Sequence, residues 1–114
     1  MNPFATPSTI ILIPANGMGH GPRDLRHKLI RTYLTLLHEN DYLPHALCFY
    51  TDGVHLLVEG SPVLDVLAAL EKKGVRLIAC STCLNFYGLT EQLKVGIMGG
   101  MTDIIEAQAR AEKV

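Results

Sequence analysis

The sequence is short of charge and of cysteine, and it contains no tryptophan. Only 18% of its 114 residues are charged, whereas 48% are hydrophobic. Because a typical globular domain carries about 25% charged residues, this composition excludes an intrinsically disordered chain. Ten Lys and Arg against eleven Asp and Glu give a net charge of −1. The basic surplus of a nucleic-acid or anionic-membrane binder is therefore missing, and near neutrality leaves little charge repulsion against a homo-oligomer.

Long hydrophobic runs are missing as well. The longest purely aliphatic run is Ile10–Ile13, whereas a membrane-spanning helix needs about 20 apolar residues. No Lys or Arg precedes this run and Pro14 breaks it, so the N-terminal segment does not read as a secretory signal. We therefore expect a cytoplasmic protein with no membrane segment.

Short aliphatic runs alternate with longer amphipathic segments along the chain, and the length suits a single domain over residues 1–114. The runs that predict buried strands are Ser8–Ile13, Ala46–Tyr50, Val75–Ala79 and the shorter Val95–Met98. Strands that alternate with helices form mainly parallel sheets covered by helices. The pattern therefore predicts an α/β layer fold.

Two long segments between these strands predict helices. The first begins at Gly21-Pro22 and ends at Asn40-Asp41, and the second runs from Ser61-Pro62 to Lys72-Lys73-Gly74. Both have a proline near the first helical position, where its missing N–H does no harm. The apolar side chains that we expect to be buried are Leu25, Leu29, Tyr33, Leu36 and Leu37 on the first helix, and Val63, Val66, Leu67 and Leu70 on the second.

Two further helices follow, a short one over Leu84–Tyr87 and a last one capped by Thr102. On the first helix, a separate basic face is formed by Arg23, His27 and Arg31. We interpret this face as a solvated surface.

Cys80 and Cys83 lie where the third strand should end. Reactive groups in open parallel sheets gather at the carboxyl ends of the strands, and the start of a helix favours the nucleophilic thiolate over the thiol. The Ser81 and Thr82 hydroxyls offer further hydrogen bonds. The alternative is a pair of small buried side chains in a tight turn. Cys48, in the middle of the second strand, is interpreted as core packing.

Three kinds of chemistry use such a pair. Thioredoxin-like exchange does not fit, because the pair comes late and no proline follows Pro62. A structural zinc site usually needs four ligands, and one Cys-x-x-Cys with scattered histidines does not supply them, so we expect no metal and no other cofactor. Sulfur transfer needs one nucleophilic cysteine, which takes up sulfur as a persulfide, and benefits from a second thiol nearby.

A candidate binding loop joins the first strand to the first helix and consists of Asn16, Gly17, Met18, Gly19 and His20. Glycines let the backbone approach a ligand, and a helix start attracts anions. The glycine spacing matches neither the dinucleotide fingerprint nor a phosphate-binding Walker loop. Because the loop and Cys80 should share one sheet edge, we expect His20 to face the thiolate as a cation or proton donor. The alternative is an exposed loop histidine.

The segment Gly74–Leu89, with its Cys-x-Thr-Cys-Leu-x-Phe-Tyr-Gly stretch, resembles the DsrE/DsrF-like sulfur-relay superfamily. It is most similar to the YedF-like branch, labelled sulfurtransferase-like selenium metabolism proteins. The resemblance covers nearly the whole chain and extends to Asn16-Gly17-Met18-Gly19, Phe49-Tyr50, Gly53-Val54 and Val95-Gly96. It implies a three-layer α/β/α fold with a mainly parallel sheet of four or five strands.

The resemblance also implies a function. The superfamily cysteine lies eight residues before a glycine, as Cys80 lies before Gly88. Cys80 would therefore carry the persulfide, accepting or transferring sulfane sulfur or selenium, and Cys83 would resolve or hold it. The implied partners are a sulfur donor or acceptor protein, for example a TusA-like carrier, and further copies of the chain; no nucleic acid or membrane is expected.

Two features depart from the relatives' pattern. Many of them carry an N-terminal TusA-like domain with a Cys-Pro-x-Pro motif, which this chain does not contain. They also usually end with a final strand, and Ala111-Glu112-Lys113-Val114 stops where that strand would begin. The alternative function is a non-catalytic binding or regulatory module, which uses the glycine loop for a small anionic ligand or a protein partner.

Overall fold

The computed structural model describes residues 2–5 and 8–114; positions 1, 6 and 7 of the N-terminal segment lie outside this description. The elements in chain order are β1 (Ile10–Ile13), α1 (Arg23–Glu39), β2 (Ala46–Phe49), the 3₁₀ helix η1 (Thr51–Leu57), α2 (Leu64–Lys72), β3 (Arg76–Cys80), α3 (Ser81–Phe86), the 3₁₀ helix η2 (Thr90–Gln92), β4 (Ile97–Gly99) and α4 (Met101–Arg110). Within the described residues, no helix is long and apolar enough to cross a bilayer.

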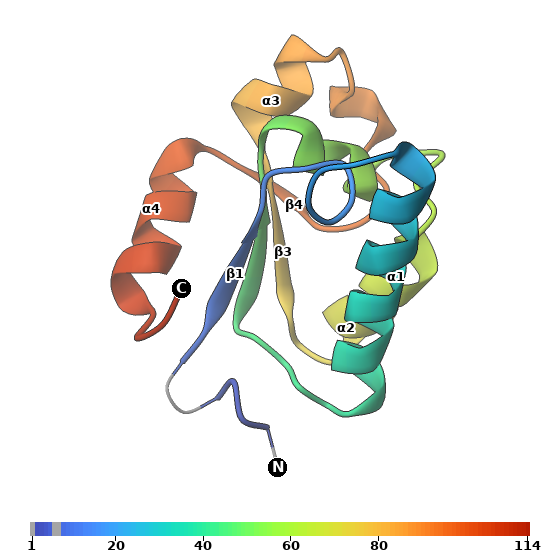
Figure 1. Cartoon of the computed structure of the whole chain (residues 1–114). Coiled ribbons are helices and arrows are strands. Elements are labelled where there is room, and N and C mark those ends of the chain that lie inside the picture. The colour runs from blue at the N-terminus through green and yellow to red at the C-terminus, as the bar shows by residue number, and fades with distance from the viewer. Residues whose placement is uncertain (1, 6–7) are drawn as a thin grey trace.

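The strands form one parallel sheet in the order β1-β2-β3-β4. The helices α1 and α2 cover one face of this sheet and α4 covers the other (Figure 1). This arrangement confirms the predicted α/β/α fold with a parallel sheet, because each crossover from one parallel strand to the next must pass over a face.

A fifth strand is only begun. Thr9 and Lys113 form an isolated parallel bridge, and the Ile10 N–H donates to the Lys113 carbonyl at 3.0 Å. The N–H groups of Glu112 and Lys113 donate to the Ser8 carbonyl at 3.0 and 2.9 Å. The residues after α4 therefore return to the outer edge of β1, and they pair with it at one point.

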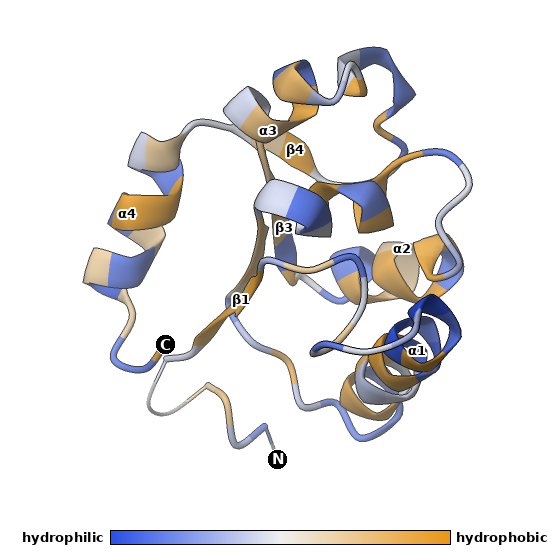
Figure 2. Ribbon diagram, turned by 45° about the horizontal axis from the view of Figure 1, so that its top comes forward, coloured by the Kyte–Doolittle hydropathy of each residue, from blue (hydrophilic) through white to orange (hydrophobic). Residues whose placement is uncertain are grey.

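The core lies on both faces of the two central strands. All of β2 is buried, and β3 is buried except for Arg76, which explains why both runs lack a polar alternation. At the sheet edge, Ile97 and Met98 of β4 are about half exposed. Figure 2 shows the same contrast, with hydrophobic residues along the strands and mixed colours around the helices.

The predicted buried face of α1 is wrong in most of its members. Of the five predicted side chains, Leu37 is buried and Tyr33 is half-buried against the core. The other three are 43–51% exposed, namely Leu25, Leu29 and Leu36. Ile30 and Leu34 are buried in their place. The predicted and the observed buried side chains both follow helical spacing, because α1 carries apolar residues around most of its circumference. Only the packing of α1 against the sheet determines which face is buried. On α2 the predicted residues Val63, Val66, Leu67 and Leu70 are all buried.

The basic face of α1 does more than meet solvent. Arg31 forms a bidentate pair with Asp65 at 3.1 and 2.8 Å and donates to the Pro62 carbonyl at 2.6 Å. This contact ties α1 to the beginning of α2. The hydrogen bond from Arg31 lowers the pKa of Asp65 to about 2.

Two helix starts differ from the prediction. Thr102 does not cap α4, which begins at Met101 after Gly100. The Asp103 carboxylate accepts the Gly100 N–H at 2.8 Å and so closes the first turn. The helix α3 begins at Ser81, directly after the last residue of β3. The two cysteines therefore lie on the strand end and the first turn of one continuous segment.

Candidate functional site

The carboxyl ends of the strands bring the candidate residues to one edge of the sheet. Ile13 of β1 pairs with Phe49 of β2, and Phe49 pairs with Ala79, one residue before Cys80. The glycine loop, η1 and α3 follow directly from these three ends. In Figure 1 they lie together above the sheet. The prediction that the loop and Cys80 share this edge is therefore confirmed.

The two cysteines of the pair differ in exposure. Cys80 ends β3 with only 1% of its surface exposed. Cys83, on the first turn of α3, is half-buried. Cys48, in β2, has no exposed surface, which confirms its interpretation as core packing.

Thr51 is the main polar contact of Cys83. Its backbone N–H donates to Cys83 Sγ at 3.1 Å. Thr51 has a φ of +50°, a left-handed conformation that is uncommon for a β-branched residue. Strained backbone of this kind persists only where the surrounding structure enforces it, and it gathers at functional sites.

Gly53 provides that enforcement. The Tyr50 N–H donates to the Ile13 carbonyl at 3.3 Å, so η1 begins against the end of β1. A Cβ at Gly53 would lie 2.0 Å from the same carbonyl oxygen. Only glycine permits this approach, which in turn places Thr51 beside Cys83.

The pKa of the Cys83 thiol is subject to opposing effects. Burial raises the pKa of the Cys83 thiol, and the interaction with the Cys80 side chain raises it further, whereas the Thr51 N–H lowers it. The net direction is upward. At Cys83, desolvation therefore outweighs the favourable hydrogen bond from Thr51.

A polar cluster borders the cysteines. The Tyr87 hydroxyl donates to Asp52 Oδ1 at 2.5 Å, and this bond, followed by burial and the nearby charges of Asp52 and Cys83, raises the pKa of Tyr87. The His55 ring lies 4.7 Å from the Tyr87 ring, and its Nδ1 is 3.0 Å from the Asp52 carbonyl. Asp52 and Tyr87 were missed as site residues. The available signal was that Tyr87 lies four residues after Cys83, on the same face of a helix.

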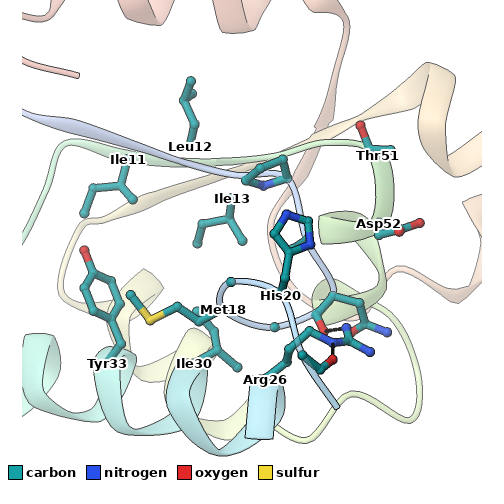
Figure 3. Close-up of a pocket in the computed structure, with 16 residues that line it drawn as sticks. Ile11, Leu12, Ile13, Met18, His20, Arg26, Ile30, Tyr33, Thr51 and Asp52 are labelled. Atoms are coloured by element: carbon teal, nitrogen blue, oxygen red, sulfur yellow. Dashed lines mark hydrogen bonds between the residues drawn. The ribbon is translucent and has the colours of Figure 1, made fainter. Parts of the chain in front are cut away.

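The glycine loop forms a separate feature, a pocket of about 690 Å³. All five residues of the predicted binding loop, Asn16 to His20, line it, together with parts of β1, α1 and η1. Figure 3 shows Ile11 and Tyr33 on one side of the pocket, Thr51 and Asp52 on the other, and His20 between them.

The loop is held in shape by α1. Arg26 donates from Nη1 to the Asn16 carbonyl at 2.6 Å and from Nε to the Gly21 carbonyl at 3.0 Å. His27 Nε2 lies 3.2 Å from Asn16 Oδ1. Gly17 has a φ of +126°, and a Cβ there would lie 2.6 Å from Arg26 Cβ. Asn16 and Gly17 therefore shape the loop.

His20 lines this pocket. Neither cysteine lines the pocket, and none of the hydrogen bonds found in the described part of the chain joins His20 to a cysteine. Thr51 and Asp52 lie between the two features, because they line the pocket and also contact Cys83 and Tyr87. The expectation that His20 faces the thiolate therefore stays a prediction, as does its alternative, an exposed loop histidine.

A metal centre does not appear at this edge. Within residues 2–5 and 8–114, no group of three or more His, Cys, Asp or Glu side chains lies close enough together to hold an ion. The groups that the site offers are its thiols, the Thr51 N–H group and the cluster of Asp52, His55 and Tyr87.

Comparison with known proteins places the chain in a family. Two solved structures share the fold over nearly their whole length. The YchN protein from E. coli has a TM-score of 0.65 and 24% identity, over 94% of this chain and 96% of that one. MTH1491 from Methanobacterium thermoautotrophicum, a protein of unknown function, has a TM-score of 0.68 and 20% identity, over 93% and 96%. No curated protein matches the sequence. The sequence pattern of the DsrE/DsrF-like family matches residues 19–114, and the chain therefore belongs to the DsrE/DsrF-like family.

Proposed function

We propose that this protein relays sulfane sulfur as a persulfide on Cys80, with Cys83 as the second thiol. The observation that carries the proposal is the placement of the two thiols. In a chain of the DsrE/DsrF-like family, they lie three residues apart at the carboxyl edge of the sheet, one of them buried and the other held by a backbone N–H. We also propose that the chain belongs to the YedF-like branch and that selenium is an alternative to sulfur.

The transfer needs no oxidant. A cysteine thiolate attacks the outer sulfur of a donor persulfide, the sulfur–sulfur bond of the donor breaks, and the donor leaves as a thiolate. The same step, run toward an acceptor thiolate, passes the sulfur on. A persulfide on Cys80 is kept from bulk water and from free thiols, because only 1% of that residue is exposed.

Sulfur trapping tests the proposal. The protein is exposed to inorganic polysulfide, desalted, alkylated and analysed by mass spectrometry. The Cys48→Ala variant serves as the background and removes the core thiol. We expect one additional sulfur atom retained on Cys80, and little retention in Cys80→Ser. Equal retention without Cys80 would contradict the assignment.

A second candidate function is a binding module, and the pocket beside the glycine loop supports it. Its polar lining includes His20, Arg26 and Asp52, although two nitrogens of the Arg26 guanidinium are already used by the loop. Calorimetric titration with inorganic phosphate tests this reading. Saturable binding that is lost in His20→Ala, with thiols that take up no sulfur, would favour the module over the relay.

We also propose the partners and the cellular location of the relay. A protein donor or acceptor, a TusA-like carrier among them, fits a cytoplasmic relay. We also propose that copies of the chain associate, which the near-neutral charge of −1 permits. Light scattering coupled to size-exclusion chromatography measures the mass in solution, and a monomer at all concentrations would contradict the homo-oligomer.

A further inference from the structure

We infer that the two cysteines act in order, with Cys83 receiving sulfur at the surface and Cys80 storing it in the interior. This inference rests on the proposed relay function and adds an entry point and a direction to it.

The first argument is access. A donor persulfide must place its outer sulfur against the attacking sulfur, and only 1% of Cys80 is exposed. Cys83 is half-buried, and the side of α3 next to it is open, since Thr82 is exposed and Phe86 is 84% exposed. In Figure 1 this short helix projects beyond the end of the sheet. A donor therefore meets Cys83 before Cys80.

The second argument is the leaving group. When a persulfide on Cys83 gives up its outer sulfur, negative charge develops on Cys83 Sγ. The Thr51 N–H already points at that atom at 3.1 Å, and it is fixed there by the left-handed backbone of Thr51. A hydrogen-bond donor aimed at developing charge lowers the barrier of a step, and the Thr51 N–H offsets part of the burial that disfavours a thiolate at Cys83.

The transfer itself balances. Cys80 Sγ attacks the outer sulfur of the Cys83 persulfide, a bond forms between these two atoms, and the bond between the outer sulfur and Cys83 Sγ breaks. The electron pair of the broken bond stays on Cys83, and the Cys80 thiol proton passes to it. The products are a Cys80 persulfide and a Cys83 thiol, with no change in overall oxidation state. Cys80 is the last residue of β3 and Cys83 lies three residues later in the first turn of α3, a spacing that places two side chains next to each other on a helical turn.

A competing step gives different products. If Cys80 attacks the inner sulfur instead, a Cys80–Cys83 disulfide forms and hydrogen sulfide leaves. The two outcomes are separable, since one keeps the sulfur on the protein and the other releases it.

The experiment is a time course of sulfur position. Protein in the Cys48→Ala background is mixed with glutathione persulfide, quenched by alkylation and digested with trypsin. Both cysteines fall in the peptide 77–94, and fragment ions that break at Ser81 or Thr82 tell them apart. The variants are Cys83→Ser and Cys80→Ala, and the circular dichroism spectrum of each is checked against that of the parent protein. The time course with both cysteines intact tests the order of loading even if a variant does not fold.

The expected result is persulfide first on Cys83 and later on Cys80. In Cys83→Ser, loading of Cys80 should slow about tenfold or more, as an extra barrier of about 1.4 kcal/mol would produce. In Cys80→Ala, Cys83 should load at least as fast, because Cys80 no longer raises the pKa of its thiol, and it should lose its sulfur rapidly to added thiol. Label that appears first on Cys80, an unchanged Cys80 rate in Cys83→Ser, or disulfide with released sulfide as the main product would each overturn the order while leaving the relay in place. Absence of persulfide on both cysteines would overturn the relay as well.

Discussion

The glycine loop and the cysteine pair lie at the same edge of the sheet, yet they are built in opposite ways. The loop is largely exposed and takes its shape from glycine backbone and from Arg26. The cysteines are buried or half-buried, and their contacts come from η1. The loop surrounds a volume in which a ligand could bind, whereas the pair concentrates chemistry at two sulfur atoms. The segment Thr51-Asp52 belongs to both regions, because it lines the pocket of the loop and its Thr51 N–H contacts Cys83.

The largest expected effect comes from displacing the segment Thr51-Asp52 at the start of η1. In Gly53→Ala the new Cβ would lie 2.0 Å from the Ile13 carbonyl oxygen, so η1 must shift. We expect the free energy of unfolding to fall by about 3 kcal/mol, at the upper end of overpacking costs, and alkylation of Cys83 to change as the Thr51 N–H moves away. Urea denaturation and timed alkylation measure both. Gly100→Ala, where a Cβ meets nothing closer than 4.0 Å, is the matched control; equal stability of the two variants would refute the role of Gly53.

A smaller effect should separate the two regions. Gly17→Ala combines a φ of +126° with a Cβ 2.6 Å from Arg26 Cβ, and we expect it to cost about 2 kcal/mol. Gly19→Ala, at a φ of +75° in open space, isolates the backbone strain alone. Thermal unfolding gives the cost, and the rate of Cys83 alkylation should stay unchanged. If that rate changes in Gly17→Ala, the loop and the cysteines do not act independently.

The pH dependence of Cys83 sharpens the contrast in burial. Because burial and Cys80 raise the pKa of Cys83, its thiolate forms only above the ordinary range of about 8.5. We expect alkylation at Cys83 to be slower at neutral pH than in an unfolded peptide, and its rate to keep rising at pH values where the rate of the unfolded peptide has levelled off. Cys80→Ala removes one of the raising causes, so the curve should move to lower pH. A rate that is already maximal at neutral pH would contradict this reading.

The smallest effect concerns the surface of α1, away from both regions. Arg31→Ala breaks the pair between Arg31 and Asp65, whose side chains are 48% and 69% exposed. Because solvent screens such a pair, we expect only a small decrease in the free energy of unfolding, less than for Gly53→Ala or Gly17→Ala. The folded pKa of Asp65 is lowered to about 2. Its contribution is therefore complete above the unfolded value of about 4 and disappears as the pH falls through the folded value.

Urea denaturation at several pH values measures the Arg31→Ala effect. Arg23→Ala removes the same charge from the same helix without this pair and serves as the control. A loss in Arg31→Ala that persists unchanged at acidic pH would show that the pair with Asp65 is not its source.

The fold and the general position of the site could be predicted from the sequence, because both depend on local signals. Buried strands appear as unbroken aliphatic runs, glycine and proline mark their ends, and parallel strands bring those ends to one edge. The prediction failed for the buried face of α1, where Leu25 and Leu29 follow the same spacing as Ile30 and Leu34. Only the sheet selects between two such faces.

The contacts of the cysteines could not be predicted, because they join distant parts of the chain. Thr51 and Cys83 are 32 residues apart, and Tyr87 and Asp52 are 35 apart. Their meeting depends on the close approach that Gly53 allows. Spacing along the sequence carries no information about such an approach between distant segments.

The most direct measurement of the central claim is the position of retained sulfur after polysulfide treatment and desalting, read by peptide fragmentation in the Cys48→Ala background. The buried position of Cys80 predicts that the sulfur atom remains there, and that Cys80→Ser, folded and with Cys83 intact, retains little. Retention of as much sulfur in Cys80→Ser as in the parent protein would contradict the claim that Cys80 is the storage thiol.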